Sequence, residues 1–269
     1  MNRIENTFDE LKQKNEGALV GFVTAGDPNI MTSLDIIRAM CRSGLDILEL
    51  GIPFSDPTAD GPVIQRSSSR ALHAGMTVKA ALKMTEDIRR ATSIPIILFS
   101  YYNPIFVYGA KRFYEDAVSA GADGLLVVDL PPEESDEMVD DWPGNAFSFI
   151  RLVAPTTSRK RMALIEKSGE GFLYLVSKTG ITGSDGLNIS EIKGNVNTLR
   201  SVTSLPICVG FGISTPEDVA AIADIADGVV IGSAFERTIE ANIDPAELPR
   251  QLSQQTAALK AATRDVGKE

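Results

Sequence analysis

The sequence predicts an α/β fold in which eight strand–helix units close into a (β/α)8 barrel. The first observation is a series of short runs rich in Val, Ile, Leu and Phe with little polar alternation, which is typical of parallel strands covered on both faces. The second is that these runs alternate with segments carrying apolar residues at i, i+3 and i+4. The third is the length of 269 residues, which suits a barrel of eight such units.

The predicted strands cover residues 18–24, 47–50, 94–100, 124–128, 147–152, 172–176, 206–209 and 228–231. The predicted helices between them cover residues 31–42, 78–92, 111–120, 133–139, 159–167, 191–202 and 217–225. Ile4, Phe8 and Leu11 stand at helical spacing and predict an extra N-terminal helix, and a last helix is expected near residues 245–262. A doubly wound open sheet is the alternative fold. Because no linker or composition break interrupts the pattern, residues 1–269 are expected to form a single TIM-barrel domain.

A short sequence motif recurs where three of these strands begin. Residues 43–46, 120–123 and 225–228 read SGLD, AGAD and IADG. In the first two, a Gly stands just past a helix, where a left-handed C-terminal cap prefers it. The recurrence supports a fold built from repeated strand–helix units.

Charge and composition exclude several classes of partner. The chain has 26 Lys and Arg against 36 Asp and Glu, a net charge of −10, which argues against nucleic acid or an anionic membrane as its main partner. It contains no apolar run of the ~18 residues that a membrane span needs and no signal-peptide pattern, so we expect a cytoplasmic protein. Cys41 and Cys208 fit no metal or redox spacing and are interpreted as core residues of a reducing compartment.

Glu49 is the first candidate for catalysis. It stands between Leu48 and Leu50 at the end of the second predicted strand. If these leucines face the helices, alternation points Glu49 into the barrel, and its burial should raise its pKa. Because active sites of such barrels lie at the carboxyl ends of the strands, we favour a catalytic carboxylate over a structural one.

The loop after this strand supplies the second candidate. Residues 51–62 contain three prolines and two glycines together with Asp56 and Asp60, and long shaped loops are commonly functional. Asp56 precedes a proline and fits a turn, whereas Asp60 is interpreted either as a helix N-cap or as a functional carboxylate. His73, the only histidine, is expected to cap helix carbonyls or lie on the surface. General acid–base chemistry therefore falls to carboxylates, Tyr or Lys, with Glu49 and Asp60 as the leading pair.

Glycines in the second half predict a phosphate site. Residues 177–186 form a Gly/Ser/Thr-rich loop after the sixth strand, residues 210–214 read GFGIS after the seventh, and residues 231–234 read IGSA before a helix. Glycines after strands seven and eight, together with a helix N-terminus, form the usual phosphate site of such barrels. Residue 215 is Thr, so GFG lacks the third Gly of a dinucleotide fingerprint, and no Walker motif occurs.

These residues closely resemble the tryptophan synthase alpha chain family. The similarity runs from Phe8 and GFVTAGDP at residues 21–28 to GSA at residues 232–234, and LELGIPFSDPTADGPVIQ at residues 48–65 resembles its signature loop. YLVS at residues 174–177 followed by GITG at residues 180–183 resembles its sixth loop. The resemblance implies a lyase of tryptophan biosynthesis that cleaves indole-3-glycerol phosphate to indole and glyceraldehyde 3-phosphate, with no cofactor or metal of its own.

The resemblance also assigns roles to individual residues. Glu49 matches the family's proton-transfer glutamate, and Asp60 matches the aspartate that accepts a hydrogen bond from the indole N–H. Phe22 and Phe99 match its indole pocket, and Tyr174 matches a tyrosine near the substrate glycerol. The remaining matches are Thr182, in the closing sixth loop, and the phosphate-binding positions Gly183, Gly212, Gly232 and Ser233.

The family passes indole to a beta chain that carries pyridoxal phosphate, so the resemblance implies an alpha2-beta2 heterotetramer. The alternatives are a free-standing indole-3-glycerol phosphate lyase and a catalytically silent barrel that binds and activates a partner. A sugar-phosphate isomerase or synthase barrel is disfavoured by the aromatic pocket and the Asp60 loop. The chain departs from the family's usual residues at Lys178, at residues 140–144 and at Phe235-Glu236, where smaller or basic residues are common.

Overall fold

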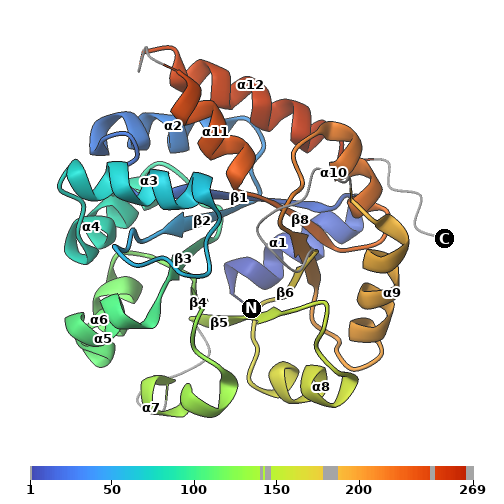
Figure 1. The fold of residues 1–269 in the computed structure, drawn as a ribbon. Helices are drawn as coiled ribbons and strands as arrows, with labels where there is room; N and C mark the ends of the chain where they lie inside the picture. The colour runs from blue at the N-terminus through green and yellow to red at the C-terminus, as the bar shows by residue number, and fades with distance from the viewer. Residues whose placement is uncertain (1, 140–141, 143–146, 178–186, 243–245, 265–269) are drawn as a thin grey trace.

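The computed structural model describes residues 2–139, 142, 147–177, 187–242 and 246–264. Within them, eight parallel strands form a closed barrel in the order β1 to β8, with helices around the outside (Figure 1). The ring closes because β8 pairs with β1 in parallel, as every other neighbouring pair does. The predicted (β/α)8 barrel is confirmed, and the open-sheet alternative is excluded.

The strands are β1 (Ala18–Thr24), β2 (Ile47–Gly51), β3 (Ile96–Ser100), β4 (Gly124–Val127), β5 (Ser148–Val153), β6 (Leu173–Val176), β7 (Ile207–Gly210) and β8 (Gly228–Ile231). The helices are α1 (Arg3–Gln13), α2 (Ile30–Arg42), α3 (Pro62–His73), α4 (Val78–Arg89), α5 (Tyr102–Tyr108), α6 (Ala110–Ser119), α7 (Asp136–Val139), α8 (Arg159–Lys167), α9 (Ile189–Arg200), α10 (Pro216–Ala223), α11 (Ser233–Ala241) and α12 (Leu248–Ala261), with a short 3-10 turn η1 (Pro132–Glu134).

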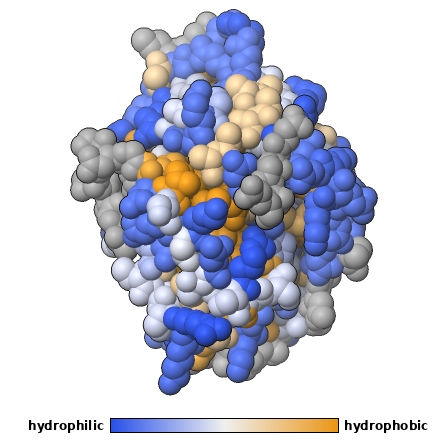
Figure 2. All heavy atoms as spheres, turned by 90° about the vertical axis from the view of Figure 1, so that its right-hand side faces the viewer, coloured by the Kyte–Doolittle hydropathy of each residue, from blue (hydrophilic) through white to orange (hydrophobic). Residues whose placement is uncertain are grey.

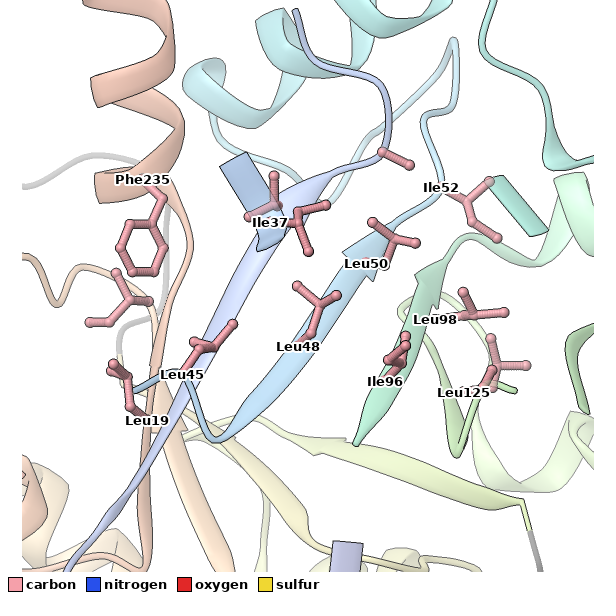
Figure 3. Packing of buried hydrophobic residues seen from close by; sticks show 14 of the residues in the cluster. Leu19, Ile37, Leu45, Leu48, Leu50, Ile52, Ile96, Leu98, Leu125 and Phe235 are labelled. Atoms are coloured by element: carbon pink, nitrogen blue, oxygen red, sulfur yellow. The ribbon is translucent and has the colours of Figure 1, made fainter. Parts of the chain in front are cut away.

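The strands separate two apolar layers because successive side chains point to opposite faces. One layer fills the barrel interior and includes Val20, Phe22 and Ile97. The other lies between strands and helices, and Figure 3 shows Leu48 and Leu50 of β2 within it. Both faces of every strand are therefore buried, which explains the continuous apolar runs in the sequence.

The predicted N-terminal helix is confirmed as α1. Asn2 and Glu5 form a reciprocal capping box at its start. Ile4, Phe8 and Leu11 are its buried residues and belong to the same cluster as the barrel interior. The ring of Phe8 lies 5.8 Å from that of Phe172, directly before β6. The helix therefore closes the amino-terminal end of the barrel, opposite the end where a substrate is expected.

The aspartate of each repeated sequence motif makes the same contact. We call this contact the aspartate clamp (Asp46, Asp123 and Asp227). Asp46, just before β2, accepts a hydrogen bond from the Leu19 amide of β1 at 2.7 Å, and its own amide donates to the Leu19 carbonyl at 3.0 Å. The carboxylate thus replaces the hydrogen-bond acceptor that a strand lacks where it begins. The same two bonds join Asp123 to Ile96 of β3 and Asp227 to Ile207 of β7.

A basic side chain from the surrounding helices neutralises each aspartate clamp. The partners are Lys260 of α12 at 2.9 Å from Asp46, Arg89 of α4 at 2.6 Å from Asp123 and Arg200 of α9 at 2.8 Å from Asp227. The pairs β1–β2, β3–β4 and β7–β8 are joined in this way. In the described part of the chain, no carboxylate makes the corresponding bond between β5 and β6.

The elements differ from expectation in a few places. The helix α5 was not predicted, and the helix expected at 133–139 is divided into η1 and α7. The last helix begins at Leu248 rather than near 245, and residues 243–245 lie outside the described residues. No described helix is long and apolar enough to cross a membrane.

A wide groove lies along α1, α9 and α10 and has a volume of about 1290 Å³. Figure 2 faces the side of the barrel that carries α9 and α10 and shows apolar residues gathered in the middle with hydrophilic residues around them. The lining of this groove includes Phe8 of α1 and Asp227 of the aspartate clamp. It therefore lies toward the amino-terminal end of the strands and contains none of the predicted site residues.

Candidate active site at the carboxyl end of the barrel

Glu49 points into the barrel, as predicted. On β2 it alternates with Leu48 and Leu50, which lie in the outer layer (Figure 3). It pairs in register with Phe22 of β1 and Ile97 of β3, which both belong to the interior cluster. Only 1% of Glu49 is exposed, and its Oε1 has no hydrogen-bond partner among the described residues. An unpaired carboxyl oxygen in an apolar interior is costly, which marks Glu49 as a candidate for chemistry.

Burial raises the pKa of Glu49 from its ordinary 4.5 to about 8. The group is therefore mainly a neutral acid at pH 7. Tyr174 of β6 and Cys208 of β7 are opposite one another in register inside the barrel. A negative charge on Glu49 would raise the pKa of both groups. Burial is the main cause that raises the pKa of both groups well above their ordinary values, so both stay neutral beside it.

Asp60 is a buried loop carboxylate and not a helix cap. The N-cap of α3 is Gly61, and no side chain caps this helix, so the capping interpretation of Asp60 is wrong. The backbone amide of Asp60 donates to the Pro57 carbonyl at 3.1 Å, which turns the loop inward and leaves Asp60 9% exposed. Burial raises its pKa from 3.8 to about 6, although a hydrogen bond from Tyr101 partly opposes this shift. Asp56, in contrast, is exposed.

Tyr101 is a site residue that sequence reasoning missed. It follows β3 directly, is 3% exposed, and its hydroxyl oxygen accepts the Ala59 amide at 2.9 Å. Its hydroxyl hydrogen is then free to donate to the Asp60 carboxylate. Its ring lies 5.3 Å from that of Phe54 in the same loop. Tyr101 therefore anchors the Asp60 loop to β3, and a polar aromatic residue at the carboxyl end of a strand was the available signal.

The aromatic residues expected to bind substrate lie in the barrel interior, where Phe22 is opposite Glu49 in register. Phe22 and Phe99 meet edge to face at 5.2 Å, and Tyr174 lies 5.9 Å from Phe211. Glycines make room for these rings: a Cβ on Gly51 would lie 2.6 Å from the Phe22 ring. Phe22, Phe99 and Tyr174 are each less than a tenth exposed and belong to one cluster. The arrangement is an apolar aromatic lining suited to binding an aromatic ring.

The predicted phosphate positions follow neighbouring strands. Gly212, after β7, has a left-handed φ of +76°, and Phe211 before it also has φ of +76°, which is unusual for a residue with a side chain. Gly232 follows β8 and is the N-cap of α11, which Ser233 begins without any side-chain cap. The first amides of this helix are therefore free to bind an anion. Thr182 and Gly183 lie outside the described residues.

The other polar candidates lie in the positions that the sequence predicted. His73 is exposed, and its Nδ1 lies 2.7 Å from the Ser69 carbonyl, which confirms the expected position at a helix end. Cys208 is buried and Cys41 is half-buried, in agreement with the core interpretation. In the parts of the chain that the structure describes, no group of three His, Cys, Asp or Glu side chains could hold a metal ion.

A closed parallel barrel with buried carboxylates at the carboxyl ends of its strands defines the class as the (β/α)8-barrel enzymes. Residues 8–264 match the family model described as tryptophan synthase alpha chain. The chain therefore belongs to the tryptophan synthase alpha chain family, a family of lyases that serves tryptophan biosynthesis.

Relatives over the full length support this assignment. The chain is 61% identical over 264 residues to the tryptophan synthase alpha chain of Desulfatibacillum aliphaticivorans, covering 98% of this chain and 100% of the relative. It is 46% identical over 260 residues to that of Geobacter sp. (strain M21), with 97% of each covered.

Solved structures agree in fold. The tryptophan synthase alpha chain of Legionella pneumophila subsp. pneumophila superposes with a TM-score of 0.89 at 38% identity, covering 100% of both chains. A chain of tryptophan synthase from M. tuberculosis in its aminoacrylate-bound form gives a TM-score of 0.88 at 32% identity, covering 98% of this chain and 100% of that one.

Proposed function

We propose that this chain cleaves indole-3-glycerol phosphate to indole and glyceraldehyde 3-phosphate by a retro-aldol reaction. It would do so as one barrel domain spanning residues 1–269 and without a cofactor of its own. The observation that carries the proposal is Glu49, a fully buried carboxyl group with an unpartnered oxygen inside the barrel. Family membership supplies the substrate, and the geometry of Glu49 and Asp60 fits what the reaction requires.

Cleavage needs two proton movements, and Glu49 suits both. The bond from the indole ring to the glycerol chain breaks when the ring carbon is protonated and the neighbouring hydroxyl loses its proton to become an aldehyde. With a pKa of about 8, Glu49 holds a proton at neutral pH and donates it to the ring carbon. The carboxylate that results accepts the hydroxyl proton, so Glu49 returns to its starting state.

Asp60 serves the opposite requirement, because it must carry a negative charge. A pKa of about 6 leaves it ionised above that pH. Its carboxylate would accept a hydrogen bond from the indole N–H and stabilise the positive charge on the protonated ring. Two carboxyl groups whose environments separate their pKa values are the pattern of divided acid and base roles. The bond from Tyr101 favours the charged form of Asp60.

Substrate binding divides between the two halves of the barrel. Phe22 and Phe99 would hold the indole ring, and Tyr174 would lie near the glycerol chain. The phosphate would bind backbone amides after β7, at the start of α11 and in the sixth loop. The residues proposed for this phosphate site are Gly183, Gly212, Gly232 and Ser233, with Thr182 closing the sixth loop over the substrate.

We also propose that the barrel works with a tryptophan synthase beta chain in an alpha2-beta2 heterotetramer. The beta chain, a pyridoxal-phosphate enzyme, would take up the indole. Two large apolar residues of α5, Phe106 and Val107, are 65% and 76% exposed. They lie a few residues after Tyr101, which anchors the Asp60 loop. A partner that covered α5 would therefore influence the position of Tyr101 and, through it, the position of Asp60.

The deciding experiment measures indole released from indole-3-glycerol phosphate by the chain alone and with saturating beta chain. The proposal expects slow release alone and severalfold faster release with the beta chain, and Asp60→Asn should abolish both. Indole release that a beta chain leaves unchanged identifies a free-standing lyase. No indole under either condition identifies a silent barrel and refutes the proposal.

A further inference from the structure

The first turn of α11 contains a buried acid that the proposed chemistry does not use. Glu236 is 0% exposed, and its Oε1 accepts the Thr24 amide at the end of β1 at 2.7 Å. Its Oε2 has no hydrogen-bond partner among the described residues. A buried carboxylate with one unsatisfied oxygen is strongly disfavoured, whereas a carboxylic acid could place its proton there.

The groups around Glu236 leave it no cation of its own. Asp27, also 0% exposed, receives Arg70 Nε at 2.8 Å and Nη2 at 2.6 Å in a bidentate pair. The same Nη2 is 4.0 Å from Glu236 Oε2. The other terminal nitrogen of Arg70, Nη1, pairs with Glu240 at 3.0 Å, and Glu240 also pairs with Arg66. Burial, followed by the charge of Asp27, raises the pKa of Glu236 well above its ordinary value.

Glu236 connects α11, which begins at the predicted phosphate position, to β1 and through β1 to α3, which follows the Asp60 loop. Thr24, which it binds, also shares a hydrogen bond of 2.7 Å with Ser67 of α3, the helix that follows the Asp60 loop. Phe235, its neighbour, packs in the outer layer (Figure 3). A Cβ added to Gly232 would lie 3.4 Å from the Cβ of Phe22 on β1, so α11 begins in contact with that strand. The Glu236–Thr24 bond therefore fixes how the start of α11 sits against β1.

We propose that Glu236, as a neutral acid, is a positioning residue that holds the first turn of α11 so that the amides of Gly232 and Ser233 face the substrate phosphate. This inference rests on the proposed function, which places phosphate at that turn. Ser233 and Glu236 are three residues apart, or about 5 Å along the helix axis. A charged Glu236 would therefore repel the phosphate that the helix start attracts.

The test compares Glu236→Gln with Glu236→Ala, using glycerol 3-phosphate as the probe and calorimetry as the readout. Gln keeps an acceptor for Thr24 and adds a donor toward Asp27, so it should bind the probe as the wild type does at pH 8. Ala leaves the Thr24 amide unpaired and should weaken binding about tenfold. The exposed Glu247→Gln is the charge-matched control and should leave affinity unchanged.

The pH dependence separates positioning from simple loss of structure. A phosphate monoester is fully ionised above pH 8, because its second pKa is about 6. At a pH high enough to ionise Glu236 the wild type should lose affinity for the probe, and Glu236→Gln, which cannot ionise, should lose less. With indole-3-glycerol phosphate, Glu236→Ala should raise KM and leave kcat unchanged.

Each outcome bears on a different claim. If Glu236→Ala binds the probe as tightly as the wild type, the positioning role is refuted. If Glu236→Gln binds the probe more tightly than the wild type at pH 8, or as weakly as Ala, the neutral-acid form is refuted. A wild type that does not bind glycerol 3-phosphate refutes the phosphate site of the proposed function instead. Thermal melts identify any variant that fails to fold, and Gln is the variant that preserves every bond.

Discussion

Replacing Glu49 by Gln should separate activity from stability. Gln has the size of the neutral acid and fits the same interior position, but it cannot release or accept the proton that cleavage requires. We expect turnover to fall by about 10²–10⁴-fold, the usual contribution of general acid–base catalysis. We also expect the variant to be more stable than the wild type at alkaline pH, because the wild type must bury an ionising group there.

The magnitude follows from the two pKa values. Glu49 ionises near 4.5 when exposed and near 8 in the folded chain. Because the folded value is the higher one, its contribution to stability is complete below pH 4.5 and is lost as the pH rises toward 8. The wild type should lose about 3 kcal/mol of unfolding free energy from this group between pH 5.5 and pH 8. The Gln variant should keep that amount.

Denaturant unfolding at both pH values measures the difference. The control is Glu115→Gln, which removes one carboxylate from the exposed face of α6 and should follow the wild type. If Glu49→Gln and the wild type lose stability in parallel between pH 5.5 and pH 8, the raised pKa of Glu49 is wrong. If the folded variant still turns over at the wild-type rate, Glu49 is not the proton-transfer residue.

Three further predictions concern the ionisation of the site and the anchoring of the barrel. The kcat/KM for indole release, followed from pH 5 to pH 9.5, should be bell-shaped with limbs near pH 6 for Asp60 and pH 8 for Glu49; a profile without these limbs contradicts the assignment. Tyr101→Phe should move the acidic limb above pH 6, because it removes a bond that lowers the Asp60 pKa; an unmoved limb would show that the bond is absent in solution. Lys260→Met should lower the free energy of unfolding, measured in denaturant, by roughly 1–3 kcal/mol, because it removes the cation that pairs with the half-buried Asp46 and Glu16; its kcat/KM should match the wild type, and a changed value would contradict a purely structural role.

The strands were predictable because their burial is a local property of the sequence. A segment covered on both faces must be apolar throughout, so each of the eight predicted runs overlaps an observed strand. The helix α5 escaped prediction for a physical reason. It contains Pro104 and leaves Phe106 and Val107 exposed, so its apolar residues do not mark one buried face.

The candidate site was predictable only where it depends on strand geometry. Alternation along β2 places Glu49 inside the barrel from three consecutive residues. The burial of Asp60 depends instead on Tyr101, which lies about forty positions further along the chain and reaches its loop through the Ala59 amide. The environment of Glu236 depends on Thr24, 212 positions away. Such contacts arise from tertiary folding, and no local pattern in the sequence announces them.

The aspartate clamps have a consequence for how the barrel opens. Each joins the starts of two adjacent strands through two hydrogen bonds and an ion pair, so β1–β2, β3–β4 and β7–β8 should each open as a unit. The amides of Leu19, Ile96 and Ile207 should then exchange their hydrogens for deuterium only through the rarest fluctuations. In the described chain no aspartate clamp joins β4–β5, β5–β6 or β6–β7, so the barrel should first open within this stretch of three successive unclamped boundaries. A chain divided anywhere within this stretch would keep all three clamped pairs intact in its two fragments, so such a split should reassemble more readily than one that separates a clamped pair.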